Sequence, residues 1–149
     1  DFEGAIPEDV ASIISLMQPL VAEGLLVERS SQQIVAAIDD WMVYRVDDTI
    51  QGCSGLDRLG GKDAEIVGLA VNPPYRAANV GRRLVELLLR RAGDMGMDRV
   101  FVLTTQAIDF FQELGFQDAD LTALPAVRRS LYNDGRGSRI LMTDLRQAV

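Results

Sequence analysis

The stretch that decides the fold runs from Glu65 to Arg91 and has three parts. The apolar run EIVGLAV at 65–71 reads as a β-strand, NPPYRAANVG at 72–81 as a turn, and RRLVELLLRR at 82–91 as a helix with a basic start. Free N–H groups at a helix N-terminus bind phosphate, and nearby arginines add positive charge. The stretch therefore predicts a strand, a pyrophosphate-binding turn and a helix, with an ordinary helix start as the alternative.

Composition indicates one ordinary globular domain. The chain has 149 residues, 48% hydrophobic and 25% charged, so we expect a single domain over residues 1–149. A net charge of −7 argues against nucleic acid as a partner. No apolar run approaches the roughly 20 residues of a membrane span, and the first residues form no signal segment. We therefore expect a cytoplasmic protein without a membrane partner.

Cysteine and histidine usage limits the chemistry of the chain. It has no histidine and one cysteine, Cys53, which excludes zinc sites, histidine-dependent triads and an intrachain disulfide. The lone cysteine suits a reducing cytosol, and we expect it to be a small buried residue. We expect no metal, and a general base must come from another residue type, with carboxylates as the candidates.

Two helices are predicted before most of the strands. Pro7-Glu8-Asp9 opens the first, whose apolar residues recur at three-to-four spacing and which Gly24 ends. Ser30 with Gln33 forms a capping box for a second helix, from Ser31 to about Asp39. The residues expected to face inward are Val10, Ile13, Ile14, Met17 and Val21 in the first helix and Ile34, Val35 and Ile38 in the second.

The β-rich segments predict a mixed sheet. Trp41–Val46 and Thr49–Leu56 flank Asp47-Asp48, which is typical of a hairpin. Strands ending at Val71 and Thr104 are joined by a helix, so we expect them to be parallel neighbours. Shorter helices and strands follow, which makes the chain an α/β domain with a mixed sheet.

The turn resembles that of the Gcn5-related N-acetyltransferases, the GNAT family. Their turn reads Arg/Gln-x-x-Gly-x-Gly/Ala and holds the pyrophosphate of acetyl-coenzyme A, and this chain has Arg76-x-x-Asn79-x-Gly81. Asn79 stands where the family has glycine or a small residue. The order of the predicted elements is similar to the GNAT fold, a mixed, mostly antiparallel sheet flanked by helices.

Further segments resemble the acetyltransferase domain of bacterial N-acetylglutamate synthases, and with them the resemblance covers nearly the whole chain. They are EGLLVERS at 23–30, FVLTT at 101–105, FFQELGF at 110–116, LPAVRRSLYN at 124–133 and RGSRIL at 136–141. The resemblance implies acetyl transfer from acetyl-CoA to the α-amine of L-glutamate by direct attack, the first step of arginine biosynthesis. The family's amino-acid-kinase domain, which carries arginine inhibition in many members, is missing from this chain.

The resemblance also implies roles for individual residues. Glu65 matches the family's general base, with a pKa that burial would raise, and Thr104 matches its proton donor to the thiolate. An exposed strand glutamate and a β-favouring strand-end threonine are the respective alternatives. Coenzyme binding is expected at Leu69, Ala70, Val71, Arg76, Asn79, Val80, Gly81 and Arg82, and glutamate binding at Leu26, Arg29, Arg128, Arg136 and Ser138.

The sequence also departs from the family at substrate positions. Gly68 stands where the synthases tend to have cysteine, and Glu28 where an arginine is often found. Two other functions therefore stay open: acetylation of another amino acid or small amine, and a non-catalytic module that binds acetyl-CoA or an amino acid. A homo-oligomer also stays open, and so do an excised domain, a stand-alone enzyme and a fusion to another arginine-pathway domain.

Overall fold

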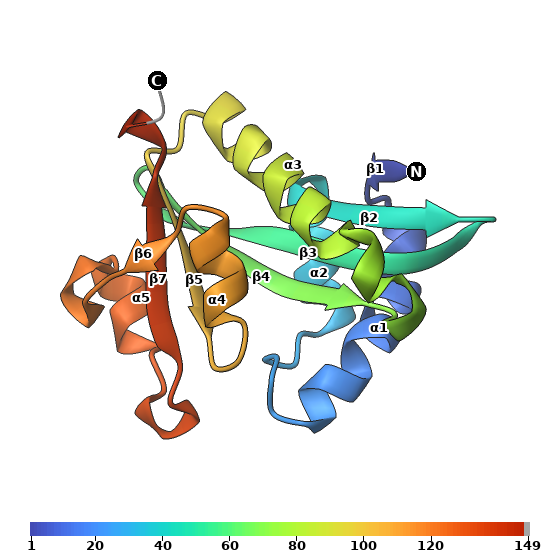
Figure 1. The fold of residues 1–149 in the computed structure, drawn as a ribbon, viewed down its shortest axis with the longest axis horizontal. Coiled ribbons are helices and arrows are strands. Elements are labelled where there is room, and N and C mark those ends of the chain that lie inside the picture. Colours follow the sequence, from blue (N-terminus) through green and yellow to red (C-terminus); the bar gives the residue numbers. More distant parts are fainter. Residues whose placement is uncertain (148–149) are drawn as a thin grey trace. The chain divides into compact units, whose positions relative to one another are not determined.

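The computed structural model describes residues 1–147, which group into two compact units. The first unit contains Asp1–Asp57 with Ile66–Arg91, and the second contains Arg58–Glu65 with the described residues from Ala92 onward. In chain order, the helices and strands are β1 Phe2–Gly4, α1 Val10–Ala22, α2 Ser31–Ala36, β2 Trp41–Val46, β3 Thr49–Gly60, β4 Asp63–Val71, α3 Val80–Asp94, β5 Arg99–Thr104, α4 Ile108–Glu113, β6 Gln117–Asp118, α5 Ala126–Ser130 and β7 Arg139–Asp144 (Figure 1).

The strands of the first unit follow the order β1-β2-β3-β4, and β1 and β2 as well as β2 and β3 are antiparallel. The β2–β3 hairpin turns at Asp47 and Asp48, whose φ angles are 49° and 64°. Two-residue hairpin turns with positive φ match the twist of the strands, and aspartate tolerates this conformation better than most residues. The predicted hairpin is confirmed.

Trp41 lies at the centre of the first unit's core. Its ring packs so closely on β4 that a Cβ atom at Gly68 would lie 2.5 Å from Trp41 Cη2. Gly68 also has a φ of +63°, a conformation that side chains disfavour. The strand can therefore turn at this point and accept the indole only because residue 68 is glycine. The buried residues of this core are Ala5, Val10, Ile13, Met17, Ile34, Trp41, Val43, Ile50, Cys53, Val67 and Ala70.

The two N-terminal helices follow the sequence pattern with two exceptions, the end of α2 at Ala36 rather than at about Asp39 and the exposure of Val35. Ser30 Oγ accepts a hydrogen bond from the Gln33 N–H at 3.1 Å, and Gln33 Oε1 accepts one from the Ser30 N–H at 2.8 Å, so the capping box is confirmed. The expectation that Val35 faces inward is wrong, because this side chain is 46% exposed. Helix α2 ends at Ala36, and neighbouring helical residues point about 100° apart, so Ile34 takes the inward position.

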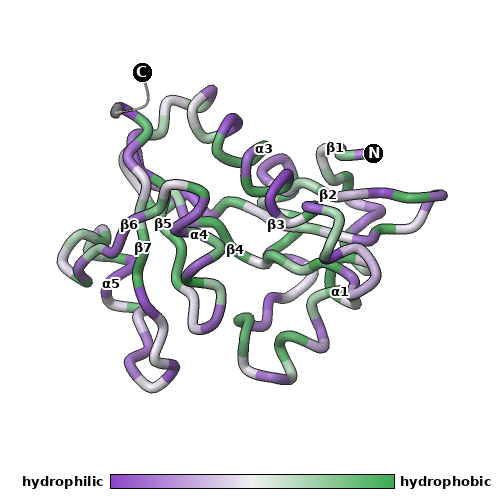
Figure 2. Tube along the Cα trace, viewed as in Figure 1, coloured by the Kyte–Doolittle hydropathy of each residue, from purple (hydrophilic) through white to green (hydrophobic). Residues whose placement is uncertain are grey.

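Helix α3 is amphipathic, as the alternation of colour along it in Figure 2 shows. Val80, Leu84 and Leu88 are buried, whereas Arg82 and Arg90 are exposed. Its first turns approach β3 closely, since a Cβ atom at Gly52 would lie 3.0 Å from Val80 Cγ1 and 3.3 Å from Leu84 Cδ1. The packed face thus fixes the start of α3 against β3.

The second unit contains the parallel part of the sheet. β4 pairs with β5 in parallel from Asp63↔Arg99 to Glu65↔Phe101, which confirms that these strands are neighbours. β7 then pairs antiparallel with both β5 and β6. Phe101, Leu124 and Ile140 form the buried core on one face. The predicted α/β fold with a mixed, mostly antiparallel sheet is confirmed, and no helix within residues 1–147 has the length and apolarity needed to cross a membrane.

Candidate active site

Glu65, the predicted base, is a buried carboxylate paired with an arginine. It lies on β4 beside Phe101 and is 6% exposed. Arg128 of α5 donates from Nε to Glu65 Oε1 at 2.6 Å and from Nη2 to Oε2 at 3.4 Å. A buried carboxylate needs such a partner, because its desolvation is otherwise expensive. The structure therefore joins the predicted base directly to one of the predicted carboxylate ligands.

The neighbouring chain fixes the position of Arg128. Leu124, just before α5, is buried in the core with Phe101. Arg129 Nη2 donates to the carbonyl oxygens of Leu124 at 2.9 Å and Thr122 at 3.3 Å, so this arginine fastens the segment that leads into α5. Arg128 and Arg129 are adjacent in sequence, but Arg128 binds the Glu65 carboxylate whereas Arg129 binds backbone carbonyl oxygens.

Thr104, the predicted proton donor, ends β5 on the other face of the second unit's sheet. Successive strand residues alternate between the two faces of a sheet, and Thr104 is three positions from Phe101. Thr104 therefore lies on the face opposite to Phe101 and to Glu65, which pairs with Phe101. Its Oγ1 accepts a hydrogen bond from the Ala107 N–H at 3.0 Å. Because the hydroxyl oxygen is held as an acceptor there, its own proton can be donated elsewhere.

The other two predicted carboxylate ligands of the second unit lie in the loop before β7. Arg136 ends the 3-10 helix Asp134–Arg136, and Gly137 follows with a φ of +67°. The Tyr132 hydroxyl donates to the Ser138 carbonyl oxygen at 2.8 Å. This bond holds the loop against Tyr132, which lies just after α5. Arg136 and Ser138 are both half-buried.

The predicted pyrophosphate turn is an exposed loop in the first unit, and hydrogen bonds hold its conformation. The Asn72 side chain donates to Gln51 Oε1 at 2.7 Å, and Arg76 Nε donates to the Val71 carbonyl oxygen at 3.2 Å. Asn79 has a left-handed φ of 60°, and its carbonyl oxygen accepts from the Arg83 N–H at 3.0 Å.

The N–H groups of α3's first turn, from Val80 to Arg82, have no intrahelical acceptor by geometry. Such groups, with the exposed Arg76 and Arg82 beside them in the same unit, are suited to holding phosphate oxygens. Arg82 Nε also lies 3.7 Å from Glu86 Oε2. This ion pair is exposed and contributes little to the stability of the fold.

The strand segment Leu69–Val71 follows the irregularity at Gly68. Ser54 Oγ donates to the Val67 carbonyl oxygen at 2.9 Å, and Cys53 Sγ donates to the Gly68 carbonyl oxygen at 3.5 Å. Burial raises the pKa of the Cys53 thiol to about 12, although a hydrogen bond from the Ala70 backbone opposes the shift. The cysteine is thus a protonated structural residue and not a nucleophile, as its sequence context indicates.

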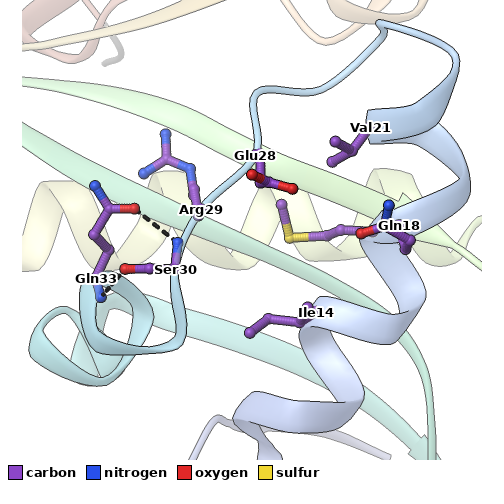
Figure 3. Close-up of a pocket in the computed structure, with 8 residues that line it drawn as sticks. Ile14, Gln18, Val21, Glu28, Arg29, Ser30 and Gln33 are labelled. Carbon is purple, nitrogen blue, oxygen red and sulfur yellow. Dashed lines mark hydrogen bonds between the residues drawn. The ribbon is translucent and has the colours of Figure 1, made fainter.

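Figure 3 shows a pocket of about 300 Å³ in the first unit, between α1 and the segment that leads into α2. Its wall includes Glu28 and Arg29, and Arg29 is one of the predicted glutamate ligands. Both terminal nitrogens of Arg29 already bind Asp57, with Nη1–Oδ1 at 3.2 Å and Nη2–Oδ2 at 2.9 Å. The remaining lining residues are Ile14, Met17, Gln18, Val21, Ser30 and Gln33.

Sequence reasoning named most of these residues but missed their pairing. Glu65 and Arg128 are 63 positions apart, and Arg29 and Asp57 are 28 apart, so no local spacing signals either contact. Leu26, predicted beside Arg29, packs as a partly buried residue against the first unit's core. Among residues 1–147, no group of three or more His, Cys, Asp or Glu side chains is arranged to hold a metal ion.

Comparison with known proteins shows to which family this chain is related. Residues 16–116 match the model of the acetyltransferase (GNAT) family. The amino-acid acetyltransferase of Buchnera aphidicola subsp. Acyrthosiphon pisum is 38% identical over 147 residues, which cover 95% of this chain and 32% of that protein. This chain therefore spans about a third of the length of the curated relatives that it matches.

Two of the similar solved structures each match 97% of this chain. One is N-acetylglutamate synthase from Neisseria gonorrhoeae in complex with coenzyme A and N-acetyl-glutamate, with 32% identity, a TM-score of 0.92, and coverage of 97% of this chain and 35% of that one. The other is Rv2747 from Mycobacterium tuberculosis in complex with CoA, with 25% identity, a TM-score of 0.83, and coverage of 97% of this chain and 99% of that one.

Proposed function

Since the chain belongs to the acetyltransferase (GNAT) family, whose model matches more than half of it, we propose that it transfers the acetyl group of acetyl-CoA to the α-amine of L-glutamate. The observation that carries this proposal is the Glu65–Arg128 contact, which sets a proton acceptor beside a carboxylate-binding group. The similarity to the Neisseria synthase, whose structure contains coenzyme A and N-acetyl-glutamate, supports the same donor and product.

We assign the coenzyme to the turn between β4 and α3. Arg76, Arg82 and the backbone N–H groups from Asn79 to Arg82 would hold the pyrophosphate, since a helix N-terminus with nearby guanidinium groups attracts phosphate oxygens. The backbone of Leu69–Val71 would pair with the pantetheine arm and supply the N–H that binds the oxyanion of the tetrahedral intermediate.

The chemistry divides between Glu65 and Thr104. Glu65 takes a proton from the substrate ammonium, the free amine attacks the thioester carbonyl carbon, and the C–S bond of the tetrahedral intermediate then breaks. Thr104 gives its hydroxyl proton to the departing thiolate. Both residues belong to the second unit, Glu65 on β4 and Thr104 at the end of β5. No covalent enzyme intermediate is needed, because holding the reactants in line supplies much of the acceleration.

The acceptor carries two carboxylates, and guanidinium groups bind carboxylates through paired hydrogen bonds. We assign this binding to Arg128 and Arg136 with the Ser138 hydroxyl, all in the second unit. Leu26 and Arg29, in the first unit, stay predicted glutamate ligands. Arg128 already binds a carboxylate, that of Glu65, through Nε at 2.6 Å and through a longer contact from Nη2 at 3.4 Å.

We propose that residues 1–149 form a single acetyltransferase domain and that this length suffices for acetyl transfer. The match to Rv2747, which covers 99% of that chain and whose structure contains CoA, supports coenzyme binding by a domain of this length. The product would serve arginine biosynthesis in the cytoplasm.

One observation favours a second acceptor class, amino acids with uncharged side chains. Arg29 is neutralised by Asp57, and the Glu28 carboxylate stands in the same pocket wall, so this pocket has less positive charge for a second carboxylate than the family pattern implies.

A thiol-release assay with acetyl-CoA tests these proposals. It compares L-glutamate, L-aspartate, L-glutamine and no acceptor, for the wild type and Glu65→Gln. We expect release specific to L-glutamate, and a kcat lower by about 10²–10⁴-fold in Glu65→Gln with coenzyme binding retained. Faster release with glutamine would support the second acceptor class. Coenzyme binding without turnover of any amino acid would reject acetyl transfer by this chain alone and point to a regulatory module or to a domain that needs a partner. Full activity of Glu65→Gln would remove Glu65 as the base.

A further inference from the structure

The predicted pyrophosphate turn is held at its first residue by Gln51 of β3. Two hydrogen bonds join Asn72 to Gln51: the Asn72 N–H donates to the Gln51 carbonyl oxygen at 2.8 Å, and Asn72 Nδ2 donates to Gln51 Oε1 at 2.7 Å. Both residues are half-buried, so water competes less for these bonds than it does on an open surface. Gln51 therefore fixes both the backbone and the side chain of the residue with which the turn begins.

Residues beside Gln51 hold the rest of the same turn. In the middle of the turn, the Tyr75 ring makes an edge-to-face contact with the Tyr44 ring, with centroids 6.0 Å apart. Tyr44 pairs with Gly52 in the β2–β3 ladder. At the end of the turn, Val80 packs over Gly52, where an added Cβ atom would lie 3.0 Å from Val80 Cγ1. The turn is thus held at its start, middle and end by one small area of the β2–β3 hairpin.

The contact with Gln51 differs from the other two because it consists of hydrogen bonds, which fix direction as well as distance. The Asn72 carbonyl oxygen accepts from the Tyr75 N–H at 2.8 Å and so begins the 3-10 helix Pro73–Ala78. This helix and Asn79 lead directly into α3. The direction in which Asn72 starts the turn therefore influences where the first N–H groups of α3 point.

We infer that Gln51 is a positioning residue for the coenzyme: by holding Asn72, it aligns Arg76 and the N–H groups of residues 80–82 before the pyrophosphate binds. This inference rests on the proposed function, which assigns the pyrophosphate to this turn. Gln51 need not touch the coenzyme, because it acts through Asn72. A turn that is ordered in advance loses less conformational entropy on binding, so it binds its ligand more tightly.

This role concerns the pyrophosphate alone. Without the Gln51 contact, the turn would adopt more conformations in the free protein, and only a fraction of them would be competent to bind. The affinity for acetyl-CoA should then fall, whereas kcat at saturating acetyl-CoA should stay the same. An acetyl donor without a pyrophosphate should be unaffected. A contact that only supports the fold would instead affect all donors alike.

The first test is a double-mutant cycle on acetyl-CoA binding, measured by calorimetric titration. Gln51→Ala and Asn72→Ala each remove one partner of the side-chain hydrogen bond, and Gln32→Ala is the control because Gln32 is exposed on α2. We expect each single variant to raise Kd about three- to tenfold, as one net hydrogen bond is worth, and the control to leave Kd unchanged. The double variant should match the single variants within about twofold, because both substitutions remove the same contact.

The second test compares acetyl-CoA with S-acetylpantetheine, which carries the thioester and the pantetheine arm but no pyrophosphate. With L-glutamate as the acceptor, Gln51→Ala should lower kcat/KM for acetyl-CoA about three- to tenfold through a higher KM. For S-acetylpantetheine, kcat/KM should stay within about twofold of the wild type, because this donor does not use the turn.

Three results would overturn the role of Gln51 while leaving the proposed function intact. They are an unchanged Kd in Gln51→Ala, single-variant effects that multiply in the double variant, and an equal loss with the two donors. If the wild type acetylates no amino acid or does not use S-acetylpantetheine, the binding cycle decides alone. If Gln51→Ala does not fold, Asn72→Ala against the control decides, since it removes the same bond from the turn. If the wild type binds no acetyl-CoA, both proposals fail.

Discussion

Asn79 departs from the family motif and has a left-handed backbone conformation. It joins the 3-10 helix Pro73–Ala78 to α3 with a φ of 60° and a ψ of 24°. Glycine adopts this left-handed conformation without strain, and asparagine does so more readily than other residues with a side chain. The position therefore requires a backbone shape and not the absence of a side chain.

This requirement predicts different results for two substitutions of Asn79. Asn79→Gly should keep the turn and bind acetyl-CoA within about threefold of the wild type, because glycine accepts the same φ. Asn79→Ala should lower the unfolding free energy by about 1 kcal/mol and weaken acetyl-CoA binding several-fold, because alanine resists positive φ. Calorimetric titration with acetyl-CoA and urea unfolding measure both effects. Equal binding by the two variants would show that the conformation of residue 79 is irrelevant to the site.

At the scale of elements, β4 owes its irregular course to Gly68. The strand turns there with a φ of +63°, and the carbonyl oxygens of Val67 and Gly68 accept hydrogen bonds from side chains of β3, those of Ser54 and Cys53. The ring of Trp41 fills the space over Gly68. Sequence comparison alone presents residue 68 as a substrate position, whereas the structure gives it a packing role.

Gly68→Ala should therefore destabilise the protein for two reasons, strain and overlap. Gly61→Ala is the matched control, because Gly61 has a similar φ of +59° and nothing within 4 Å of a Cβ atom. We expect the unfolding free energy to fall by about 1–2 kcal/mol in Gly61→Ala, from backbone strain alone. In Gly68→Ala it should fall by about 3 kcal/mol or more, because the Cβ atom also overlaps the indole ring. Urea unfolding of both variants measures the difference, and equal losses would mean that Trp41 moves aside freely.

Elements specified by local signals could be predicted from the sequence. The capping box at Ser30 and Gln33 and the hairpin at Asp47-Asp48 depend on residues within a few positions of each other, and both are confirmed. The parallel pairing of β4 with β5 followed from the helix between them. Strand β3 runs to Gly60 rather than to Leu56, because the pairing of a strand with its neighbours, not its own composition, sets where it ends.

Contacts distant in sequence could not be predicted in this way. The residues of the candidate site were named through family resemblance, which assigns roles one position at a time. Whether Arg128 binds Glu65, or Arg29 binds Asp57, depends on how α5 and the segment before α2 pack, and no sequence pattern carries that information. The same limit explains Val35, whose direction depends on which face of α2 packs against the core.

For the whole molecule, the distribution of charge matters more than its sum. The net charge of −7 repels an anionic coenzyme at long range, but this repulsion is screened beyond about 8 Å at physiological salt. The turn between β4 and α3 presents Arg76, Arg82 and Arg83 on an exposed surface. Local donors can therefore bind a pyrophosphate on an acidic protein.

This binding predicts that acetyl-CoA stabilises the folded protein. At a concentration of about 100 times Kd, a ligand that binds only the folded state adds about 2.7 kcal/mol to the unfolding free energy. For a chain of this size that corresponds to a rise in Tm of roughly 5–10 °C. Arg76→Ala/Arg82→Ala should lose most of the shift, whereas Arg139→Ala, which removes one positive charge from an exposed pair, should keep it. Thermal unfolding with and without acetyl-CoA measures the shift. An undiminished shift in the double variant would place the pyrophosphate elsewhere, because the stabilisation would then not depend on the guanidinium groups of the turn.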